Sequence, residues 1–176
     1  MRLIFLFILI PIKLVFSQSQ LPVNDSVQNF LFAKSKFNNP ILITVNGVYE
    51  YKSKWEYSPL IDDSFKKQIK EIDELNHANF FTKIVRNDLY IISNGAGPVF
   101  KKSGNNFIRI DNSTLHKNQF GGARFVYNDK VHIYGGYGFW SFKNFITFFD
   151  ENIKQWDIFY NNSKYLPPGR WKPIYN

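Results

Sequence analysis

The sequence contains no cysteine in its 176 residues, which excludes disulfide bonds and thiolate metal sites. Its three histidines, His77, His116 and His132, lie far apart and do not share the spacing of metal ligands. No Ser-His-Asp elbow, His-Glu-x-x-His motif or phosphate-binding loop is present. We therefore expect no catalytic residue, no bound metal and no cofactor.

Glycine-rich stretches occur at Gly95–Gly97 and Gly135–Gly136, but neither leads into a helical pattern. A phosphate cradle needs a helix after its glycines, because the helix N-terminus binds the anion. Strand-like residues follow both stretches instead. We therefore expect these glycines to serve the backbone, which can adopt positive φ and approach its neighbours closely at glycine.

Basic residues are not clustered, although the chain has a formal net charge of +8. The lysines are scattered, as Lys34, Lys52, Lys66, Lys83, Lys101, Lys130 and Lys154 illustrate. A nucleic-acid-binding protein gathers such residues on one face or motif. We therefore expect no nucleic-acid partner. The charge indicates a solvated surface, or attraction to anionic glycans or cell surfaces.

The N-terminus carries the one long apolar run of the sequence. It has a positive start at Arg2, an apolar stretch over Leu3–Phe16, and small residues before Gln18. This pattern is typical of a secretory signal peptide over residues 1–17. A membrane anchor is the alternative, but the run is interrupted by a proline and a lysine and is shorter than the about 20 residues that span a bilayer. We expect an exported protein, found in the periplasm, on the cell surface or secreted, with no transmembrane segment after the signal peptide.

Residues 18–176 form one domain in this interpretation, and their composition favours strands. Aromatic residues make up 19% of the chain, with ten Gly and eight Pro to supply turns. Short strand-like runs occur at Phe125–Tyr127, Val131–Tyr134 and Phe145–Phe149, separated by turn residues. This pattern predicts an antiparallel meander of three or four strands and an all-β fold.

The order of residues in this stretch resembles one repeat of the kelch family. The matching positions are Arg124, Gly135, Gly136, Asp150 and Trp156. The resemblance implies a four-stranded blade of a β-propeller, in which the glycine pair shapes the backbone and Trp156 packs between blades.

A weaker copy of the stretch lies 41 residues earlier, and such a period indicates a repeat array. The paired positions are Asn87 with Asn128, Asp88 with Asp129, Gly95 with Gly136, and Gly97 with Gly138. Phe107–Ile110 is then expected to be a third strand that ends at Asp111, so that Phe107–Asp111 corresponds to Phe145–Asp150. No Trp follows Asp111, so this copy departs from the kelch pattern.

A third candidate blade surrounds the Asn46-Gly47 hairpin signal. Its runs Ile41–Val45 and Val48–Tyr51 are either the first two or the last two strands of a blade. The segment Ser58–Leu75 has two interpretations. Apolar residues at helical spacing favour a helix, whereas the strands around it favour a strand pair.

The candidate binding residues lie in the loop between the second and third runs of the central stretch. They are Tyr137, Phe139, Trp140, Lys143 and Asn144. The kelch resemblance implies that this connection lies on the rim where ligands bind, and its aromatic rings suit stacking on a sugar. The alternative is that the rings pack on an adjacent blade.

The chain also suggests an incomplete ring, with two blades and a third candidate. The segment Pro167–Arg170 resembles the opening of another blade, and propellers have about four to eight. Further blades of a longer chain, or self-association, would cover the exposed edge and face.

These features predict an exported, non-catalytic propeller module that binds a protein or glycan partner, and that forms the sensing part of a longer receptor. The alternative is a fragment of a carbohydrate-active kelch enzyme, similar to a sugar epimerase or to galactose oxidase. The copper cofactor of the latter contains a tyrosine crosslinked to a cysteine, which this chain lacks.

Overall fold

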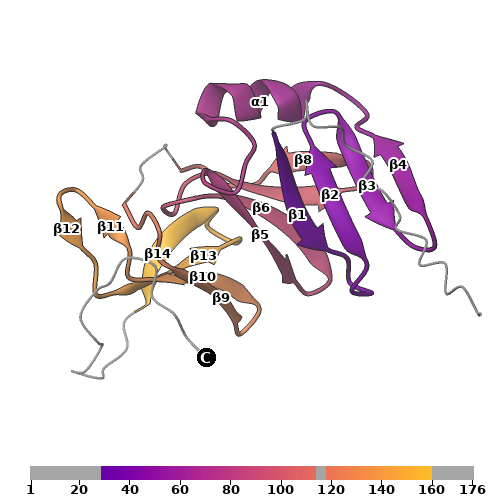
Figure 1. Ribbon diagram of the computed structural model, residues 1–176. Coiled ribbons are helices and arrows are strands. Elements are labelled where there is room, and N and C mark those ends of the chain that lie inside the picture. The colour runs from indigo at the N-terminus through magenta and orange to yellow at the C-terminus, as the bar shows by residue number, and fades with distance from the viewer. Residues whose placement is uncertain (1–28, 114–117, 160–176) are drawn as a thin grey trace, which may run out of the picture.

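The computed structural model describes residues 29–113 and 118–159. Within these ranges the chain consists of strands and one short helix, so the predicted all-β class is confirmed (Figure 1). The expected signal peptide over residues 1–17, His116 and the Pro167–Arg170 segment lie outside the described residues.

The strands form three four-stranded antiparallel sheets, which we number in chain order. Sheet 1 contains β1 (Phe30–Lys34), β2 (Pro40–Thr44), β3 (Gly47–Tyr51) and β4 (Trp55–Pro59). Sheet 2 contains β5 (Phe80–Val85), β6 (Asp88–Ser93), β7 (Val99–Ser103) and β8 (Asn106–Arg109). Sheet 3 contains β9 (Ala123–Tyr127), β10 (Lys130–Tyr134), β13 (Ile146–Asp150) and β14 (Gln155–Phe159). In each sheet these strands pair in the order in which they follow along the chain.

Sheet 2 is the middle layer, and both of its faces are apolar. Along β6, Leu89 and Ile91 point to sheet 1, whereas Tyr90 and Ile92 point to sheet 3, as the period of two of a strand requires. The core on the first side contains Leu31, Ile41, Ile43, Val48, Phe65, Ile69, Leu75, Phe80, Leu89, Ile91, Phe100 and Phe107. The core on the second side contains Phe81, Val85, Tyr90, Ile92, Ala96, Val99, Val131, Ile133 and Phe149.

The first strands of successive sheets lie beside one another. β1 contacts β5, and β5 in turn contacts β9. The fourth strands β4, β8 and β14 form the opposite edges of their sheets. The three sheets therefore meet at their first strands and stack face to face from there.

Helix α1 (Ser64–Ile72) settles the two interpretations of the segment Ser58–Leu75 in favour of a helix. Its apolar side chains Phe65 and Ile69 are buried against sheets 1 and 2. The carboxylate of Asp62 accepts a 2.8 Å hydrogen bond from the backbone N–H of Ser64, which satisfies one free donor of the first turn. Ser58 itself belongs to β4.

The predicted strand order of sheet 2 is wrong at its third strand. Phe107–Ile110 was expected there, but this stretch supplies the fourth strand, β8, while Val99–Ser103 forms the third. The third strand escapes the pattern because only Val99 and Phe100 are apolar in it, followed by two lysines. Phe107 therefore takes the position of Trp156. It pairs with the second-last residue of its neighbour, as Trp156 does.

The repeat distance also differs from the expected 41 residues. The β5–β6 turn follows Val85, which pairs with Asp88, and the β9–β10 turn follows Tyr127, which pairs with Lys130. These equivalent residues are 42 positions apart (127 − 85 and 130 − 88). The identical Asn–Asp letters mislead by one position, because in sheet 2 the turn residues are Arg86 and Asn87.

The third candidate blade is sheet 1, but its two predicted runs are its middle strands. The sequence allows them to be the first two or the last two strands, because β1 shows no clear alternation of apolar and polar residues. The turn between β2 and β3 consists of Val45 and Asn46, since Ile43 pairs with Val48. Gly47 already belongs to β3, where the ring of Tyr57 covers it.

No helix in the described parts of the chain is long and apolar enough to cross a membrane.

Candidate binding site

The predicted binding loop folds into a small hairpin that projects from sheet 3 (Figure 1). Its strands are β11 (Tyr137–Gly138) and β12 (Ser141–Phe142), joined by Phe139 and Trp140. Both joining residues have positive φ, 46° and 62°, as in a type I′ turn. Their side chains are 70% and 93% exposed. We call residues 137–142 the aromatic hairpin.

The base of the aromatic hairpin depends on the glycine pair. Gly135 and Gly136 have φ of 71° and 85°, which bends the chain out of β10. A Cβ at Gly136 would lie 2.7 Å from the carbonyl group of Gln119, so no larger residue fits. The pair therefore shapes the backbone at this bend, and its close neighbour Gln119 is a residue that the sequence did not indicate.

Gln119 holds the two ends of the connection together. Its buried amide donates to the carbonyl oxygens of Ile133, Gly135 and Phe145, at 3.1–3.3 Å. The Thr147 hydroxyl donates to its side-chain oxygen at 2.5 Å. One side chain thus joins β10, the glycine bend and β13. It lies 16 residues before Gly135 in sequence and belongs to no recognisable motif, so sequence reasoning missed it.

The other predicted binding residues lie around this hairpin. Tyr137 is half-buried and packs edge-to-face on Phe142, with ring centroids 5.2 Å apart. The Lys143 ammonium donates to the Ser141 hydroxyl at 2.9 Å and lies 5.8 Å from the Phe139 ring. Asn144 is exposed just beyond β12.

The exposed ring of Phe142, a further aromatic residue of the predicted loop, belongs to the same surface. It lies on β12 directly opposite Tyr137, so that the two rings form a cross-strand pair.

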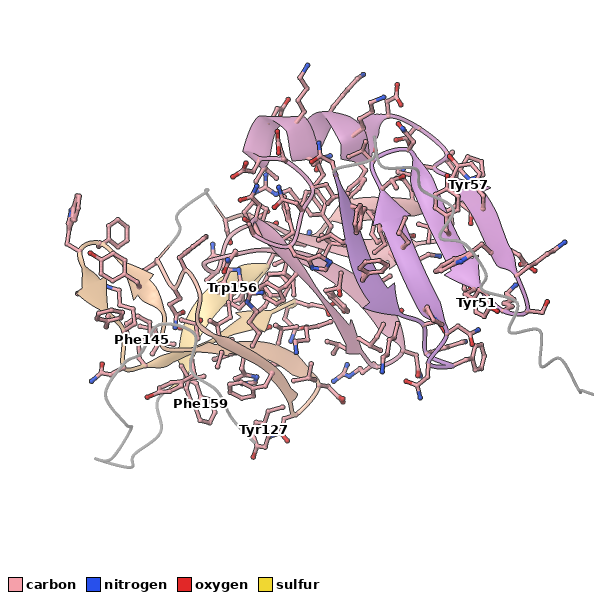
Figure 2. The ribbon with its side chains drawn as sticks, in the orientation of Figure 1. Tyr51, Tyr57, Tyr127, Phe145, Trp156 and Phe159 are labelled. Carbon is pink, nitrogen blue, oxygen red and sulfur yellow. The ribbon has the colours of Figure 1, made fainter. Side chains whose placement is uncertain are left out.

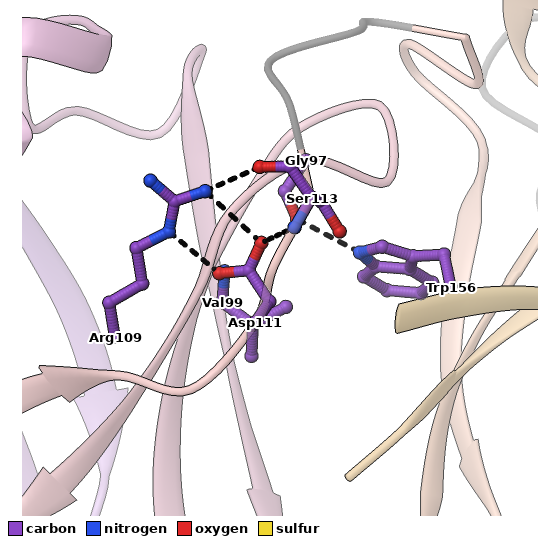
Figure 3. Close-up of polar contacts among 6 residues, drawn as sticks. All are labelled: Gly97, Val99, Arg109, Asp111, Ser113 and Trp156. Atoms are coloured by element: carbon purple, nitrogen blue, oxygen red, sulfur yellow. Dashed lines mark hydrogen bonds and ion pairs between the residues drawn. The ribbon is translucent and has the colours of Figure 1, made fainter. Parts of the chain in front are cut away.

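The remaining kelch-like positions lie within or between sheets. The Arg124 guanidinium lies 4.4 Å from the Phe81 ring centroid, across the interface of sheets 2 and 3. Asp150 pairs with Lys130 at 2.7 Å, and this hydrogen bond lowers the pKa of the Asp150 carboxyl. Trp156 packs beside the core of that interface, and its indole N–H donates to the Gly97 carbonyl at 2.9 Å (Figure 3).

Asp111 organises the link from sheet 2 to sheet 3 (Figure 3). Its buried carboxylate accepts hydrogen bonds from the backbone N–H groups of Val99 and Ser113, both at 2.8 Å. The Arg109 guanidinium donates to the same carboxylate at 2.9 Å. The sequence selected Asp111 as a strand end, but the side chain fixes the turn that leaves β8.

A charged cavity of ≈140 Å³ lies between sheets 2 and 3, beside their first turns. Arg86 pairs with Asp129 at 2.9 Å. Lys101 lies 3.5 Å from Glu151, and the Tyr90 hydroxyl donates to the same Glu151 carboxylate. Burial and, secondly, this hydrogen bond raise the pKa of Tyr90 to about 12. These groups are paired across the interface, so we interpret the contacts around the cavity as links that hold sheets 2 and 3 together.

The histidines do not form a metal centre in the described residues. The ring of His77 accepts a hydrogen bond from the Phe32 backbone N–H at 3.0 Å. His132 is buried among aromatic rings, and this burial lowers its pKa. No group of three or more His, Asp or Glu side chains capable of holding a metal occurs in residues 29–113 and 118–159.

The aromatic hairpin therefore carries exposed aromatic rings on a strained turn, with the Lys143 ammonium beside them. No protein-family model matches the sequence, and no curated protein matches it either.

Proposed function

We propose that this chain is an exported, non-catalytic β-propeller module of the kelch type that binds a protein or glycan partner. The sheet arrangement supports the propeller. Each sheet is a four-stranded meander, successive sheets stack face to face, and their first strands adjoin. Blades around a propeller axis have these relationships. A module of this kind suits the sensing part of a longer receptor.

The observation that carries the binding function is the backbone of the hairpin tip. Phe139 and Trp140 occupy two consecutive left-handed positions that strongly favour Asn-Gly. Each such residue costs roughly 1 kcal/mol relative to glycine. The strain presents a Trp ring that is 93% exposed, which brings no folding benefit from burial. Strain of this kind is concentrated at functional sites.

The shape of the hairpin favours a protein over a glycan. Small-ligand sites are concave and enclose most of the ligand. Trp140 and Phe139 instead stand at a projecting tip. A projecting aromatic tip suits insertion into a groove of another protein, where Trp is the residue type most enriched among binding hot spots.

Site-specific photo-crosslinking tests this proposal. A photoreactive phenylalanine analogue replaces Trp140 in the full chain, produced in the cells that export it. The matched control carries the analogue at Phe37, which is 72% exposed on the β1–β2 connection. We expect a discrete crosslinked protein at position 140, absent at position 37, and competed away by excess unmodified chain but not by the Trp140→Ala chain.

Equal crosslinking at both positions would contradict binding by the hairpin. Retention on immobilised cell-surface polysaccharide that is lost in Trp140→Ala, without any protein crosslink, would identify a glycan as the partner instead.

A fragment of a carbohydrate-active kelch enzyme is the second candidate, and the charged cavity between sheets 2 and 3 is the observation that favours it. Tyr90 and Glu151 meet there, beside Lys101. Their mutual pairing supports the structural role more directly. The enzyme would become the preferred interpretation if the chain hydrolysed or epimerised a sugar and the Glu151→Gln variant lost this activity while retaining the fold.

A further inference from the structure

The stack of sheets ends in an aromatic face on sheet 1. Tyr49 and Tyr51 lie on the side turned away from sheet 2, because they alternate along β3 with the core residue Val48. Tyr57 and Trp55 of β4 lie on the same side, since they pair with Tyr49 and Tyr51. The rings of Tyr49 and Tyr57 are 4.7 Å apart. Tyr57 is 49% exposed. We call these four residues the sheet 1 outer face.

A second aromatic face closes the other end of the stack, on sheet 3. Tyr127, His132, Phe148 and Phe159 lie on the side turned away from sheet 2. The rings of the other three surround His132 at centroid distances of 5.8–5.9 Å. Tyr127 is 54% exposed. Figure 2 shows Tyr51 and Tyr57 beside sheet 1 at the right of the molecule, and Tyr127 and Phe159 along the lower side of sheet 3. We call this second set the sheet 3 outer face.

The internal repeat shows what covers such a face. Tyr90 occupies in sheet 2 the position that His132 occupies in sheet 3, since each pairs with the third residue of the third strand. The Tyr90 face is covered by the opposite face of the next sheet, which contributes Phe149 and Trp156. The sheet 3 outer face is therefore matched to the corresponding face of another sheet of this type. In sheet 1, that corresponding face is the sheet 1 outer face.

A hydrogen-bond donor on the sheet 1 outer face points to the same pairing. The indole N–H of Trp55 is buried but has no hydrogen-bond partner. Trp156, on the fourth strand of sheet 3 and on the corresponding face, donates its indole N–H to Gly97 of the preceding sheet. An unpaired buried donor is costly, and a reorientation of the Trp55 ring on pairing would bring its N–H to an acceptor on the adjoining sheet and remove that cost.

We propose that the sheet 3 outer face of one copy binds the sheet 1 outer face of a second copy, head to tail. The second copy then continues the face-to-face stacking that sheets 1, 2 and 3 show within one chain. Two copies of three described sheets bring six sheets together, which lies within the about four to eight blades of closed propellers. In that ring the same contact forms twice.

Sedimentation of the full chain and two single variants tests the pairing. Tyr57→Glu places a charge on the sheet 1 outer face, and Phe159→Glu places one on the sheet 3 outer face. We expect the unmodified chain to sediment as a dimer at micromolar concentration. Each variant alone should associate at least about tenfold more weakly, because a buried charge replaces an interface aromatic.

Mixing the two variants distinguishes head-to-tail pairing from other arrangements. Each variant keeps the face that the other has lost, so an equimolar mixture should recover a dimer through one intact contact. Ile61→Glu, at a residue 76% exposed between β4 and α1, is the matched control and should remain dimeric. Recovery in the mixture also shows that both variants are folded.

Three results would overturn the proposal. They are a monomeric unmodified chain at every concentration, a dimer that persists in Tyr57→Glu alone, and a mixture that stays monomeric. A second measurement follows the Trp55 indole N–H by nuclear magnetic resonance. Its signal should move with chain concentration, and Trp55→Phe should weaken dimerisation, whereas Trp156→Phe should not. A Trp55 signal that is independent of concentration in a proven dimer would also contradict the pairing.

Discussion

The indole N–H of Trp156 donates a hydrogen bond to the carbonyl of Gly97, 59 residues earlier in the chain, and joins β14 to the loop between β6 and β7. The same ring lies 5.6 Å from that of Phe149, beside the core between sheets 2 and 3. One side chain therefore fixes the distance between two sheets by both packing and a directional contact.

Removing this side chain should loosen sheet 3 from sheet 2. We expect Trp156→Ala to lower the free energy of unfolding by about 3 kcal/mol, because a large ring leaves a cavity. Trp156→Phe should cost only about 1–2 kcal/mol, since it keeps most of the packing and loses the hydrogen bond. Chemical denaturation monitored by circular dichroism measures both values. An unchanged midpoint for the alanine variant would show that Trp156 does not stabilise the interface.

The tip of the aromatic hairpin should become more stable when its aromatic residues are removed. Replacing Phe139 with Asn and Trp140 with Gly supplies the residues that the positive φ angles favour. We expect a gain of roughly 1–2 kcal/mol in unfolding free energy from the relieved strain. Phe37→Gly, at an exposed aromatic residue outside the positive-φ set, is the control and should give no gain. A stability loss in the double variant would mean that the two rings contribute packing.

Two glycines with positive φ should differ in their tolerance of a side chain. Gly104→Ala should cost about 1 kcal/mol, because φ is +55° but no atom lies within 4 Å of the added Cβ. Gly136→Ala should cost more than about 2 kcal/mol, since its Cβ would also meet the Gln119 backbone. Thermal unfolding of the two variants side by side checks the order. Equal losses would indicate that the glycine bend can shift away from Gln119.

The raised pKa of Tyr90 predicts a loss of stability in alkali. The pKa moves from 10.0 to about 12, so between these values the unfolded chain releases a proton that the folded chain retains. Ionisation of Tyr90 therefore leaves the unfolding free energy unchanged below about pH 10, and lowers it as the pH rises toward 12. Lys101, whose pKa is raised chiefly by its hydrogen bond to Asp88, adds a fall in the same direction.

Denaturation titrations from neutral to alkaline pH test this prediction. Tyr90→Phe should show a shallower decline above pH 10 than the unmodified chain, because the Tyr90 contribution is lost and that of Lys101, which Asp88 chiefly and Tyr90 partly supply, is reduced. It should also be less stable at neutral pH, because the hydrogen bond to Glu151 is lost. Parallel curves for the two proteins would contradict the assignment.

The local architecture of sheet 3 was predictable because its residues carry independent signals that agree. Apolar alternation in β10, the Asn128-Asp129 turn and the aromatic run of β13 all indicate the same strand boundaries. Sheet 2 was predicted less completely, because Lys101 and Lys102 give β7 the pattern of a loop. Their charges are tolerated there since Lys101 pairs with Asp88 from the adjacent strand. Such a pairing depends on contacts that local patterns do not contain.

The candidate binding residues could be selected as a group from the sequence, but the conformation that presents them could not be predicted. An aromatic loop between two strands was evident from Tyr137 to Asn144. That Phe139 and Trp140 take positive φ contradicts local preference, so no propensity argument leads to it. Gln119 was equally inaccessible, because its role arises from three carbonyl groups that converge only in the folded chain.

The two-sided burial of sheet 2 has a consequence for how this chain can change by insertion and deletion. One residue added within β6 would exchange Leu89 and Ile91 with Tyr90 and Ile92 between opposite faces, and would disrupt both cores at once. Length changes are therefore tolerated only in the connections between strands. The second and third strands are joined by residues 45–46 in sheet 1, 94–98 in sheet 2 and 135–145 in sheet 3. The aromatic hairpin lies in the longest of these three connections, where added residues would not shift the register of a strand.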